Sequence, residues 1–268
     1  MRSEPTQETP ELPPGTRIQP ADCETHGIYD QKIFPLLGKE LKSGCPACSR
    51  IIRETTEAAE LASKALELRL AMERKLGAAL IPKRFACKTL DGYIVTNPGQ
   101  RKALATCRRY ADEFSQIAET GRCLLLLGKP GTGKTHLSVG IANEIMGKST
   151  ATAVYRTIGA VLLAIRATYD KTSVQSESQI LSSLISPSLL ILDEIGVSKE
   201  NPSDFELTTL FSIINGRYEE LRPTVIISNL DGQSLPAAMG ERCIDRLREG
   251  RVIVIPFDWE SERGKEGF

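Results

Sequence analysis

A complete phosphate-binding motif stands at residues 128–135, which read GKPGTGKT and match the pattern G-x-x-x-x-G-K-[ST] in full. Glycines let such a loop close around phosphates, so that its backbone N–H groups and the start of the next helix face the anion. We expect Lys134 to reach the β- and γ-phosphates of ATP and the Thr135 hydroxyl to bind Mg²⁺. The expected nucleotide-binding residues are Gly128, Lys129, Pro130, Gly131, Thr132, Gly133, Lys134, Thr135 and, directly after them, His136. A histidine at this helical position also suits a packing role, which we favour over a role as a base.

Two carboxylates follow an apolar segment further along the chain. Residues 189–192 are all apolar, as in a strand buried on both faces, and Asp193 and Glu194 come directly after them. Ligands of parallel sheets bind at the carboxyl ends of the strands. There Asp193 suits Mg²⁺, and Glu194 suits polarising the attacking water. The pair predicts ATP hydrolysis; the alternative is a solvated acidic strand end.

Two further groups can serve phosphoryl transfer. Asn229 ends the apolar segment 224–228, where its amide can orient the attacking water; the alternative is a cap on a turn or helix. Residues 240–248 contain three arginines, among them Arg242. An arginine that neutralises transition-state charge is often supplied by a neighbouring subunit. A solvated basic helix face is the alternative.

Four soft ligands near the N-terminus have the spacing of a zinc site. Cys23 and His26 form one pair and Cys45 and Cys48 the second, each suited to a tight turn that presents two ligands to one ion. Four such ligands make a closed tetrahedral Zn²⁺ site, which is structural rather than catalytic. The segment has too few apolar residues for a core of its own, so a metal would have to hold it together. The alternative is a set of unrelated surface cysteines, and the remaining cysteines stand alone.

Strands and helices must alternate to position the phosphate-binding groups. The apolar patterns predict strands at 122–127, 151–157, 189–193, 224–228 and 251–255, and helices at 100–117, 134–146, 158–169, 176–184, 203–221 and 240–248. Such alternation predicts an α/β fold with a parallel sheet that helices cover on both faces.

Composition changes divide the chain into four parts. Residues 1–22 contain five prolines and few aliphatic residues, and we expect a flexible tail. Residues 23–49 would be the zinc-binding module. Residues 50–80 would be an amphipathic helix and linker, with the helix capped by Ser49 and ended by Gly77. Residues 81–268 would be the ATPase domain.

Charge and hydropathy exclude several functions. The chain has 268 residues, with 34 Lys and Arg against 34 Asp and Glu, so it cannot coat nucleic acid or an anionic membrane as a bulk polycation. No apolar run is long enough to span a membrane, and the N-terminus lacks the pattern of a signal peptide. We therefore expect a cytoplasmic protein with no membrane partner.

From Ile81 to Arg263 the chain resembles the AAA+ ATPases of the DnaC-type bacterial and phage helicase loaders, with the IstB transposition helpers as close relatives. The segments that carry this resemblance are GKPGTGKTHL (128–137), LLILDEIGV (189–197), IISN (226–229), GERCIDRLREG (240–250) and FDWESERGKE (257–266). The phosphate-binding motif is generic, but the GER-x-x-DR segment followed by a strand and FDWES is much narrower.

The resemblance implies a fold and roles for the residues above. It implies an AAA+ core with a five-stranded parallel sheet, in which Asp193 and Glu194 are the Walker B pair and Asn229 is sensor 1. Arg242 falls at the position of the arginine finger and Arg263 at that of sensor 2.

The resemblance also implies partners. Relatives grip single-stranded DNA through the helix after the second strand and the loop after Walker B, where this chain has Arg166, Tyr169, Lys171, Asn201 and Ser203. Tyr169 can stack on a base, although it can equally be a half-buried helix aromatic.

We expect an ATP-dependent loader that places a DnaB-like replicative helicase on single-stranded DNA and self-associates through AAA+ interfaces. An IstB-like regulator of a transposase is the alternative. A small-molecule kinase is a third interpretation, against which the water-activating residues Glu194 and Asn229 argue.

Overall fold

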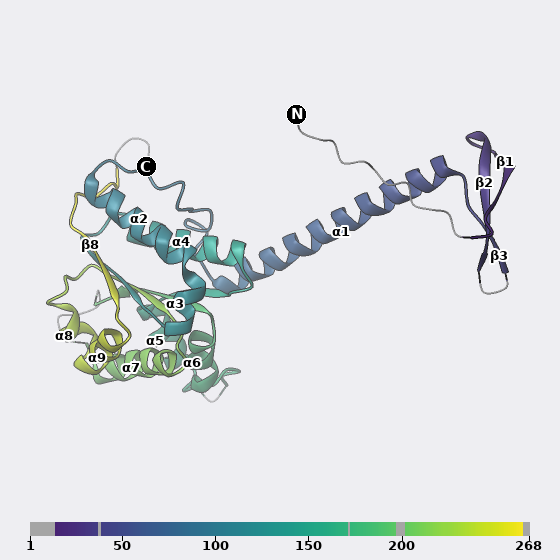
Figure 1. The fold of residues 1–268 in the computed structure, drawn as a ribbon. Coiled ribbons are helices and arrows are strands. Elements are labelled where there is room, and N and C mark those ends of the chain that lie inside the picture. The colour runs from purple at the N-terminus through teal and green to yellow at the C-terminus, as the bar shows by residue number, and fades with distance from the viewer. Residues whose placement is uncertain (1–13, 37–38, 171, 197–201, 265–268) are drawn as a thin grey trace. The chain divides into compact units, whose positions relative to one another are not determined.

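The computed structural model describes residues 14–36, 39–170, 172–196 and 202–264. The chain divides into two compact units, Met1–Arg69 and Leu70–Phe268, and the boundary falls inside helix α1 (Pro46–Ala79). Figure 1 shows the elements of both units.

The first unit contains a small antiparallel sheet of β1 (Arg17–Cys23), β2 (Gly27–Leu36) and β3 (Lys39–Lys42). β1 and β2 pair along their length, from Arg17 opposite Ile33 to Cys23 opposite Gly27. The expected flexible tail up to residue 22 is therefore wrong from Arg17 onward, because this segment gains its backbone hydrogen bonds from β2. Among the described hydrophobic residues of the sheet and the turn after it, only Ile33 and Cys45 are buried.

Helix α1 is longer than expected at both ends. It begins at Pro46, a residue suited to the first helical position, and Ser49 already lies in the first turn, where its N–H donates to Cys45 O at 2.9 Å. Ser49 is thus not the cap. The helix also passes Gly77 and ends at Ala79, after which Leu80 adopts a left-handed conformation with φ of 56°.

The second unit confirms the expected α/β fold with a parallel five-stranded sheet. The strand order is β5-β6-β7-β4-β8, and every neighbouring pair is parallel. The strands are β4 (Leu124–Gly128), β5 (Ala153–Thr157), β6 (Leu189–Ile195), β7 (Thr224–Ser228) and β8 (Ile253–Phe257).

Helices cover both faces of this sheet (Figure 1). One apolar core joins the sheet to α2 (Pro98–Asp112), α3 (Phe114–Thr120) and α4 (Lys134–Lys148). The other joins it to α5 (Ile158–Ala167), α6 (Glu177–Ile185), α7 (Asp204–Glu219), α8 (Leu235–Met239) and α9 (Glu241–Glu249). Alternate strand residues serve opposite faces: Leu124 belongs to the first core and Leu125 to the second.

One further helical prediction needs correction, and one short helix was missed. The single helix expected at 100–117 is two helices, because the chain leaves the helical path at Glu113 between α2 and α3. α2 begins at a capping box in which Asn97 and Gln100 each accept a hydrogen bond from the other's backbone N–H. The short helix α8 was not predicted, since five residues give too little periodicity to recognise.

Buried Arg217 joins the ends of three elements at the amino edge of the sheet. Its side chain is 1% exposed and donates to Thr224 Oγ1 and to the carbonyls of Leu184, Ile185, Pro187 and Pro223 at 2.6–3.0 Å. Burial lowers its pKa to about 9. Because these bonds hold the starts of β6 and β7 beside α6 and α7, they fix where the opposite, carboxyl ends emerge.

Candidate functional site

The phosphate-binding loop lies between β4 and α4, and its glycines are required by contact. Gly128, Gly131 and Gly133 all have positive φ, between 78° and 127°. A Cβ on Gly128 would lie 2.3 Å from Phe257 O, and one on Gly133 would lie 2.6 Å from the Tyr93 ring. Only glycine fits, so the backbone is held as a cradle at the start of α4, an arrangement that suits a polyphosphate.

Lys134 is held inside this loop. Its side chain is largely buried, and Nζ donates to Gly128 O at 2.6 Å and to Lys129 O at 2.7 Å. Burial lowers its pKa to about 8, an effect that Asp193 opposes and Arg263 reinforces. A desolvated ammonium in a backbone cradle is suited to phosphate oxygens, and both Asp193 and Arg263 lie close enough to influence it.

Asp193 links the loop to the sheet. One carboxylate oxygen, Oδ2, accepts hydrogen bonds from Thr135 Oγ1 at 3.0 Å and from Tyr155 OH at 2.8 Å. The other, Oδ1, accepts from the backbone N–H of Glu194 at 2.7 Å. Hard oxygen donors at this spacing fit Mg²⁺, with Thr135 and Asp193 as the expected ligands. Tyr155 was missed by sequence reasoning, since one tyrosine inside an apolar strand gives no signal.

Glu194 sits at an irregularity in β6. Its backbone has φ of 64°, and the register between β6 and β7 shifts between Leu192 and Ile195. A non-glycine residue in this region is uncommon, and such strain concentrates at functional sites. The shift turns the Glu194 side chain out to solvent, whereas Asp193 stays buried.

Asn229 comes directly after β7, the strand between β4 and β6. The structure therefore brings it to the same sheet edge as the phosphate-binding loop and the two carboxylates. Its side chain is exposed. Next to it, Ser228 Oγ donates to Ile195 O at 2.7 Å, which holds the ends of β6 and β7 together.

Residues 258–264, which follow β8, lie over the phosphate-binding loop, and we call them the covering segment. Thr132 O accepts from both Trp259 Nε1 and Tyr93 OH, each at 3.1 Å, and the Glu262 N–H donates to Gly131 O at 2.9 Å. A Cβ on Gly131 would lie 2.0 Å from Ser261 Oγ. Two loop carbonyls are thus occupied from outside, so these peptide units turn their oxygens away from the cradle.

Arg263 belongs to this covering segment. Its Cγ would lie 3.3 Å from a Cβ on Gly131, and its charge lowers the pKa of Lys134. The structure therefore places Arg263 beside the loop, and its role as sensor 2 stays a prediction. Sequence reasoning missed Tyr93 and Trp259; the FDWES segment that contains Trp259 was its only signal.

His136 points away from the loop toward the segment before α2. Its Nε2 lies 2.9 Å from Thr89 O, and its ring meets the Tyr93 ring edge-on at 5.3 Å. Burial lowers its pKa. This placement favours the packing role over a nucleotide contact.

Arg242 lies in the first turn of α9 with its side chain exposed. The guanidinium carbon is 4.6 Å from the centroid of the Phe211 ring on α7, within cation–π range. Its neighbour Arg246 instead donates to Asn215 Oδ1 at 3.1 Å and lies over Tyr218. Arg242 is thus the more available of the two for a neighbouring molecule.

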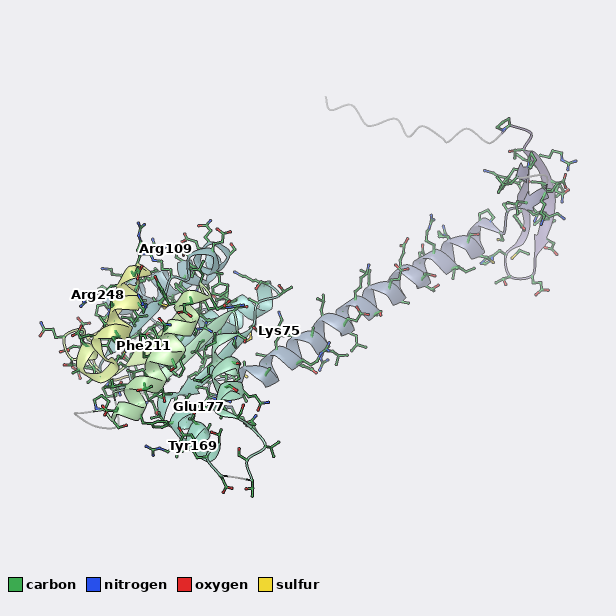
Figure 2. All side chains as sticks on the ribbon, turned by 90° about the horizontal axis from the view of Figure 1, so that it is seen from below. Lys75, Arg109, Tyr169, Glu177, Phe211 and Arg248 are labelled. Carbon is green, nitrogen blue, oxygen red and sulfur yellow. The ribbon has the colours of Figure 1, made fainter. Side chains whose placement is uncertain are left out.

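Two of the expected DNA-binding residues come together. Arg166, in the last turn of α5, and Tyr169, just after it, both lie against the Phe205 ring, with 6.4 Å between the centroids of the two rings. Tyr169, labelled in Figure 2, is 62% exposed. Ser203 caps α7 by accepting from the Glu206 N–H, so its hydroxyl already has a structural role. Phe205 was missed by sequence reasoning. Lys171 and Asn201 lie outside the described residues.

The four expected zinc ligands converge. One ligand atom from each of Cys23, His26, Cys45 and Cys48 lies within 4.8 Å of every other. His26 Nδ1 is 3.2–3.8 Å from the three sulfurs, and Sγ of Cys23 is 3.5 Å from Sγ of Cys48. A tetrahedral Zn²⁺ holds such atoms about 3.6–3.8 Å apart. The pKa of Cys23 is lowered, chiefly by a hydrogen bond with the Thr25 backbone and then by His26, whereas the pKa of Cys48 is raised, chiefly by its hydrogen bond with Cys23. The two neighbouring sulfurs thus share a proton, which a metal would have to displace to bind both as thiolates.

Comparison with known proteins agrees with this geometry. The model of the IstB-like ATP binding protein family matches residues 72–254. A replicative helicase loader DnaC from Buchnera aphidicola (subspecies Acyrthosiphon pisum) is 35% identical over 194 residues, 72% of this chain and 76% of that protein. The loader of the same name from Escherichia coli K12 is 29% identical over 243 residues, 89% and 96% of the two chains.

This chain belongs to the IstB/DnaC family. A crystal structure of the DnaC helicase loader is similar in fold, with a TM-score of 0.59 and 25% identity over 66% of this chain and all of that one. A crystal structure of DnaI has a TM-score of 0.56 at 22% identity, over 69% of this chain and 95% of that one, and shows the fold alone. The family is one of ATP-binding AAA+ proteins, as the sequence predicted.

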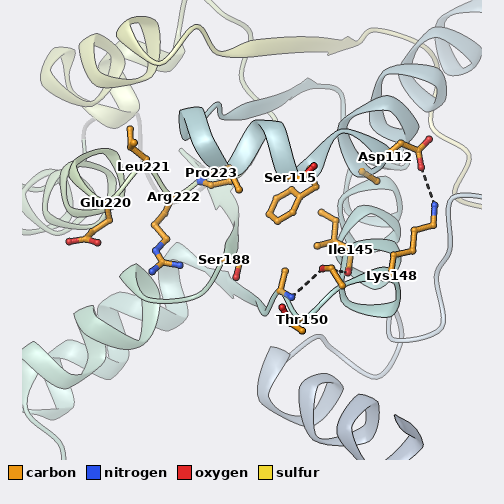
Figure 3. Close-up of a pocket in the computed structure, with 15 residues that line it drawn as sticks. Asp112, Ser115, Ile145, Lys148, Thr150, Ser188, Glu220, Leu221, Arg222 and Pro223 are labelled. Carbon is orange, nitrogen blue, oxygen red and sulfur yellow. Dashed lines mark hydrogen bonds and ion pairs between the residues drawn. The ribbon is translucent and has the colours of Figure 1, made fainter. Parts of the chain in front are cut away.

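A cavity in the second unit of this IstB/DnaC family member lies away from the phosphate-binding loop. It has a volume of about 600 Å³ and is lined by residues just before β5, β6 and β7, among them Ala151, Ser188 and Pro223 (Figure 3). An ion pair between Lys148 and Asp112, 3.0 Å apart, stands at its rim. Because it opens at the amino edge of the sheet, it does not belong to the nucleotide site.

In the described part of the chain, no helix has the length and apolar character needed to cross a bilayer.

We predict that the covering segment supports ATP binding through the Thr132 carbonyl. Trp259→Phe removes one of its two donors and should weaken ATP affinity by a few-fold, in line with about 1 kcal/mol for one hydrogen bond. The double variant Tyr93→Phe with Trp259→Phe leaves the carbonyl without either donor and should lose more than the two single variants together. Calorimetric titration with ATP measures this; Tyr218→Phe, on α7, is the control. The coupling would be contradicted if the double variant lost no more ATP affinity than the sum of the two single variants, or if all three variants bound ATP as wild type does.

We also predict about one Zn²⁺ per chain in protein purified without chelators. Cys45→Ser should release the metal and destabilise the first unit, while ATP binding in the second unit is kept. Cys87→Ser, which changes an exposed cysteine outside the cluster, should retain the metal. Elemental analysis and ATP titration together measure both effects. Metal-free wild-type protein, or Cys45→Ser with full zinc content, would contradict the assignment.

Proposed function

We propose that this protein is an ATP-dependent loader that places a DnaB-like replicative helicase on single-stranded DNA. One observation carries the proposal: Asp193, beside Glu194, accepts a hydrogen bond at 3.0 Å from the Thr135 hydroxyl of the phosphate-binding loop. The groups for metal binding and water activation thus share one sheet edge, in a chain whose relatives over most of its length are named replicative helicase loaders.

Each group at this edge has a role in the proposed hydrolysis. Thr135 and Asp193 would hold Mg²⁺, which neutralises charge on the β- and γ-phosphates when bound. Lys134 binds the phosphates, and Glu194 accepts a proton from the attacking water. Asn229 orients that water. The strained backbone that turns Glu194 outward, while Asp193 stays inside, supports two distinct roles for adjacent carboxylates.

Arg242 is proposed to complete the site of a neighbouring subunit. Its exposed guanidinium, supported by the Phe211 ring, lies on α9, whereas Arg263 lies at the loop of its own chain. An arginine finger that one subunit supplies to the ATP site of its neighbour makes hydrolysis depend on self-association. Self-association through AAA+ interfaces therefore belongs to the proposal.

The nucleotide state is proposed to set affinity for DNA and helicase. A switch of this kind requires partners to bind one state more tightly than the other. The ATP state would align Arg166, Tyr169 and Phe205 of successive subunits along a single strand, with bases stacking on the aromatic rings. The zinc module and α1 would contact the helicase, and hydrolysis would release the loader.

An IstB-like regulator of a DNA transposase is the second candidate, favoured by the description of the matching family. Its ATPase site would be the same and its partner different. Transfer of a purified DnaB-like helicase from the same organism onto circular single-stranded DNA distinguishes the two. ATP-stimulated transfer supports the loader, and its absence with active ATPase favours the regulator.

We predict that Lys134→Ala and Glu194→Gln separate binding from turnover. Lys134→Ala should lose ATP binding because a phosphate-facing cation is gone. Glu194→Gln should bind ATP but hydrolyse it at least about 100-fold more slowly, because only water activation is removed. Phosphate release and ATP titration measure the two steps. Glu194→Gln with wild-type turnover would overturn the role of Glu194.

We predict that Tyr169→Ala weakens binding to single-stranded DNA by about 1–3 kcal/mol for each stacked base. Val174→Ala, which changes a 97% exposed residue shortly after it, is the control. Fluorescence anisotropy with a labelled oligo-dT, with and without a non-hydrolysable ATP analogue, measures affinity. ATP should tighten binding by wild type. Unchanged binding by Tyr169→Ala would leave Tyr169 as a packing residue, and equal affinity in both states would remove the switch.

A further inference from the structure

A strong excess of positive charge is concentrated just before the phosphate-binding loop. Between Pro82 and Ala111 the chain has seven Lys or Arg residues and a single acidic residue, Asp91, although its total formal charge is zero. The seven lie in the segment before α2 and on α2 itself: Lys83, Arg84, Lys88, Arg101, Lys102, Arg108 and Arg109. We call these residues the basic surface.

The helix part of this surface follows the solvent face of α2. Arg101, Lys102 and Arg109 are exposed, whereas Ala103, Cys107 and Tyr110 are buried in the core. From Arg101 to Arg109 the helix rises about 12 Å, at 1.5 Å per residue. A row of cations is thus fixed on a rigid element that packs against α4; Figure 2 labels Arg109 within it.

The segment part is held against the same core. Asn143 on α4 donates from Nδ2 to Ala86 O at 3.0 Å and to Lys88 O at 2.8 Å. An ion pair of 2.8 Å joins Asp91 to Arg108 on α2. The segment and the helix therefore form one fixed surface rather than two independent loops.

The charge of this surface is not neutralised by the protein. Within the described residues, Arg108 alone among the seven has an acidic partner within ion-pair distance. The nearest acidic residue along α2, Asp112, pairs with Lys148 at 3.0 Å. Six cations thus remain available to an external polyanion.

The surface offers charge without exposed rings. Tyr93 and Tyr110 are buried, and Phe85 packs against the core. Single-stranded DNA is held largely by stacking on aromatic side chains, which the proposed strand-binding cluster of Tyr169 and Phe205 provides elsewhere on the same unit. A duplex has its bases already stacked and presents one negative charge per about 1.7 Å of its axis.

We propose that the basic surface binds the phosphate backbone of duplex DNA, independently of sequence. This goes beyond the proposed loader function, which requires single-stranded DNA alone. Phosphate contacts position a protein on DNA without reading bases. A protein with both surfaces would hold a single strand and the neighbouring duplex at once, as at the edge of an opened region.

The test compares duplex and single-strand binding as salt is varied. Full-length, zinc-loaded protein with a non-hydrolysable ATP analogue is titrated onto a labelled blunt-ended duplex or a labelled oligo-dT of equal length, followed by anisotropy from about 50 to 200 mM salt. Arg101→Gln with Lys102→Gln should reduce the log–log salt slope for duplex by about 2, because each lost phosphate contact removes about 0.9. Duplex affinity should fall on the order of tenfold, with oligo-dT affinity changed less.

Matched variants keep the result interpretable. Arg248→Gln with Arg251→Gln removes two exposed arginines from α9 and the turn after it and should leave the duplex slope unchanged. Lys83→Gln with Arg84→Gln tests the segment part without altering α2 and should also lower the slope. Wild-type protein that binds no duplex, or helix and segment variants that keep its slope, would overturn the proposal. So would equal losses in the control, or losses confined to helicase binding, which would indicate an acidic protein partner.

Discussion

The hydrogen bond from Thr135 to Asp193 joins residues 58 positions apart and depends on the strand order of the sheet. Thr135 follows β4, Asp193 ends β6, and β7 lies between the two strands. The bond can form only if all three strands are parallel and end at one edge. On the other side of β6, Tyr155 of β5 donates a hydrogen bond to the same carboxylate oxygen. One carboxylate oxygen on β6 thus accepts hydrogen bonds from two other segments. Asn229 lies at this edge because β7 ends there.

The covering segment imposes a second constraint on the same loop. None of the three loop glycines could carry a side chain, because Phe257 O, Ser261 and the Tyr93 ring occupy the space where a Cβ would lie. The loop is therefore shaped from outside by residues at both ends of the second unit. Since Arg263 follows directly after these contacts, any movement of the segment would shift the Thr132 carbonyl and the arginine together. The conformation of the phosphate-binding loop and the position of this segment are therefore coupled by their packing.

The sequence alone predicts correctly those features that depend on the residues of a single short segment. The phosphate-binding motif and the strand at 224–228 were placed correctly, because fixed spacing and continuous apolar runs are strong signals. It failed where a partner elsewhere in the chain decides the outcome. Arg17–Cys23 contains Pro20 and little apolar character, and it is a strand only because β2 pairs with it. Tyr155 and Trp259 act through single hydrogen bonds to distant residues, which leave no local pattern.

The formal net charge of the chain is zero, but its charged residues are distributed unevenly over the structure. Acidic residues at the carboxyl edge of the sheet and pairs such as Lys148 with Asp112 offset the cations of α2 in the sum but not in space. A salt-screened field extends only about 10 Å at 0.1 M salt, so a polyanion near α2 responds to the local excess rather than the total. The cluster of Tyr169 and Phe205 has the opposite character, because it offers aromatic rings and has a single arginine, Arg166, beside it. The two surfaces thus differ in chemistry, one being cationic and the other aromatic, and the net charge alone does not reveal the cationic one.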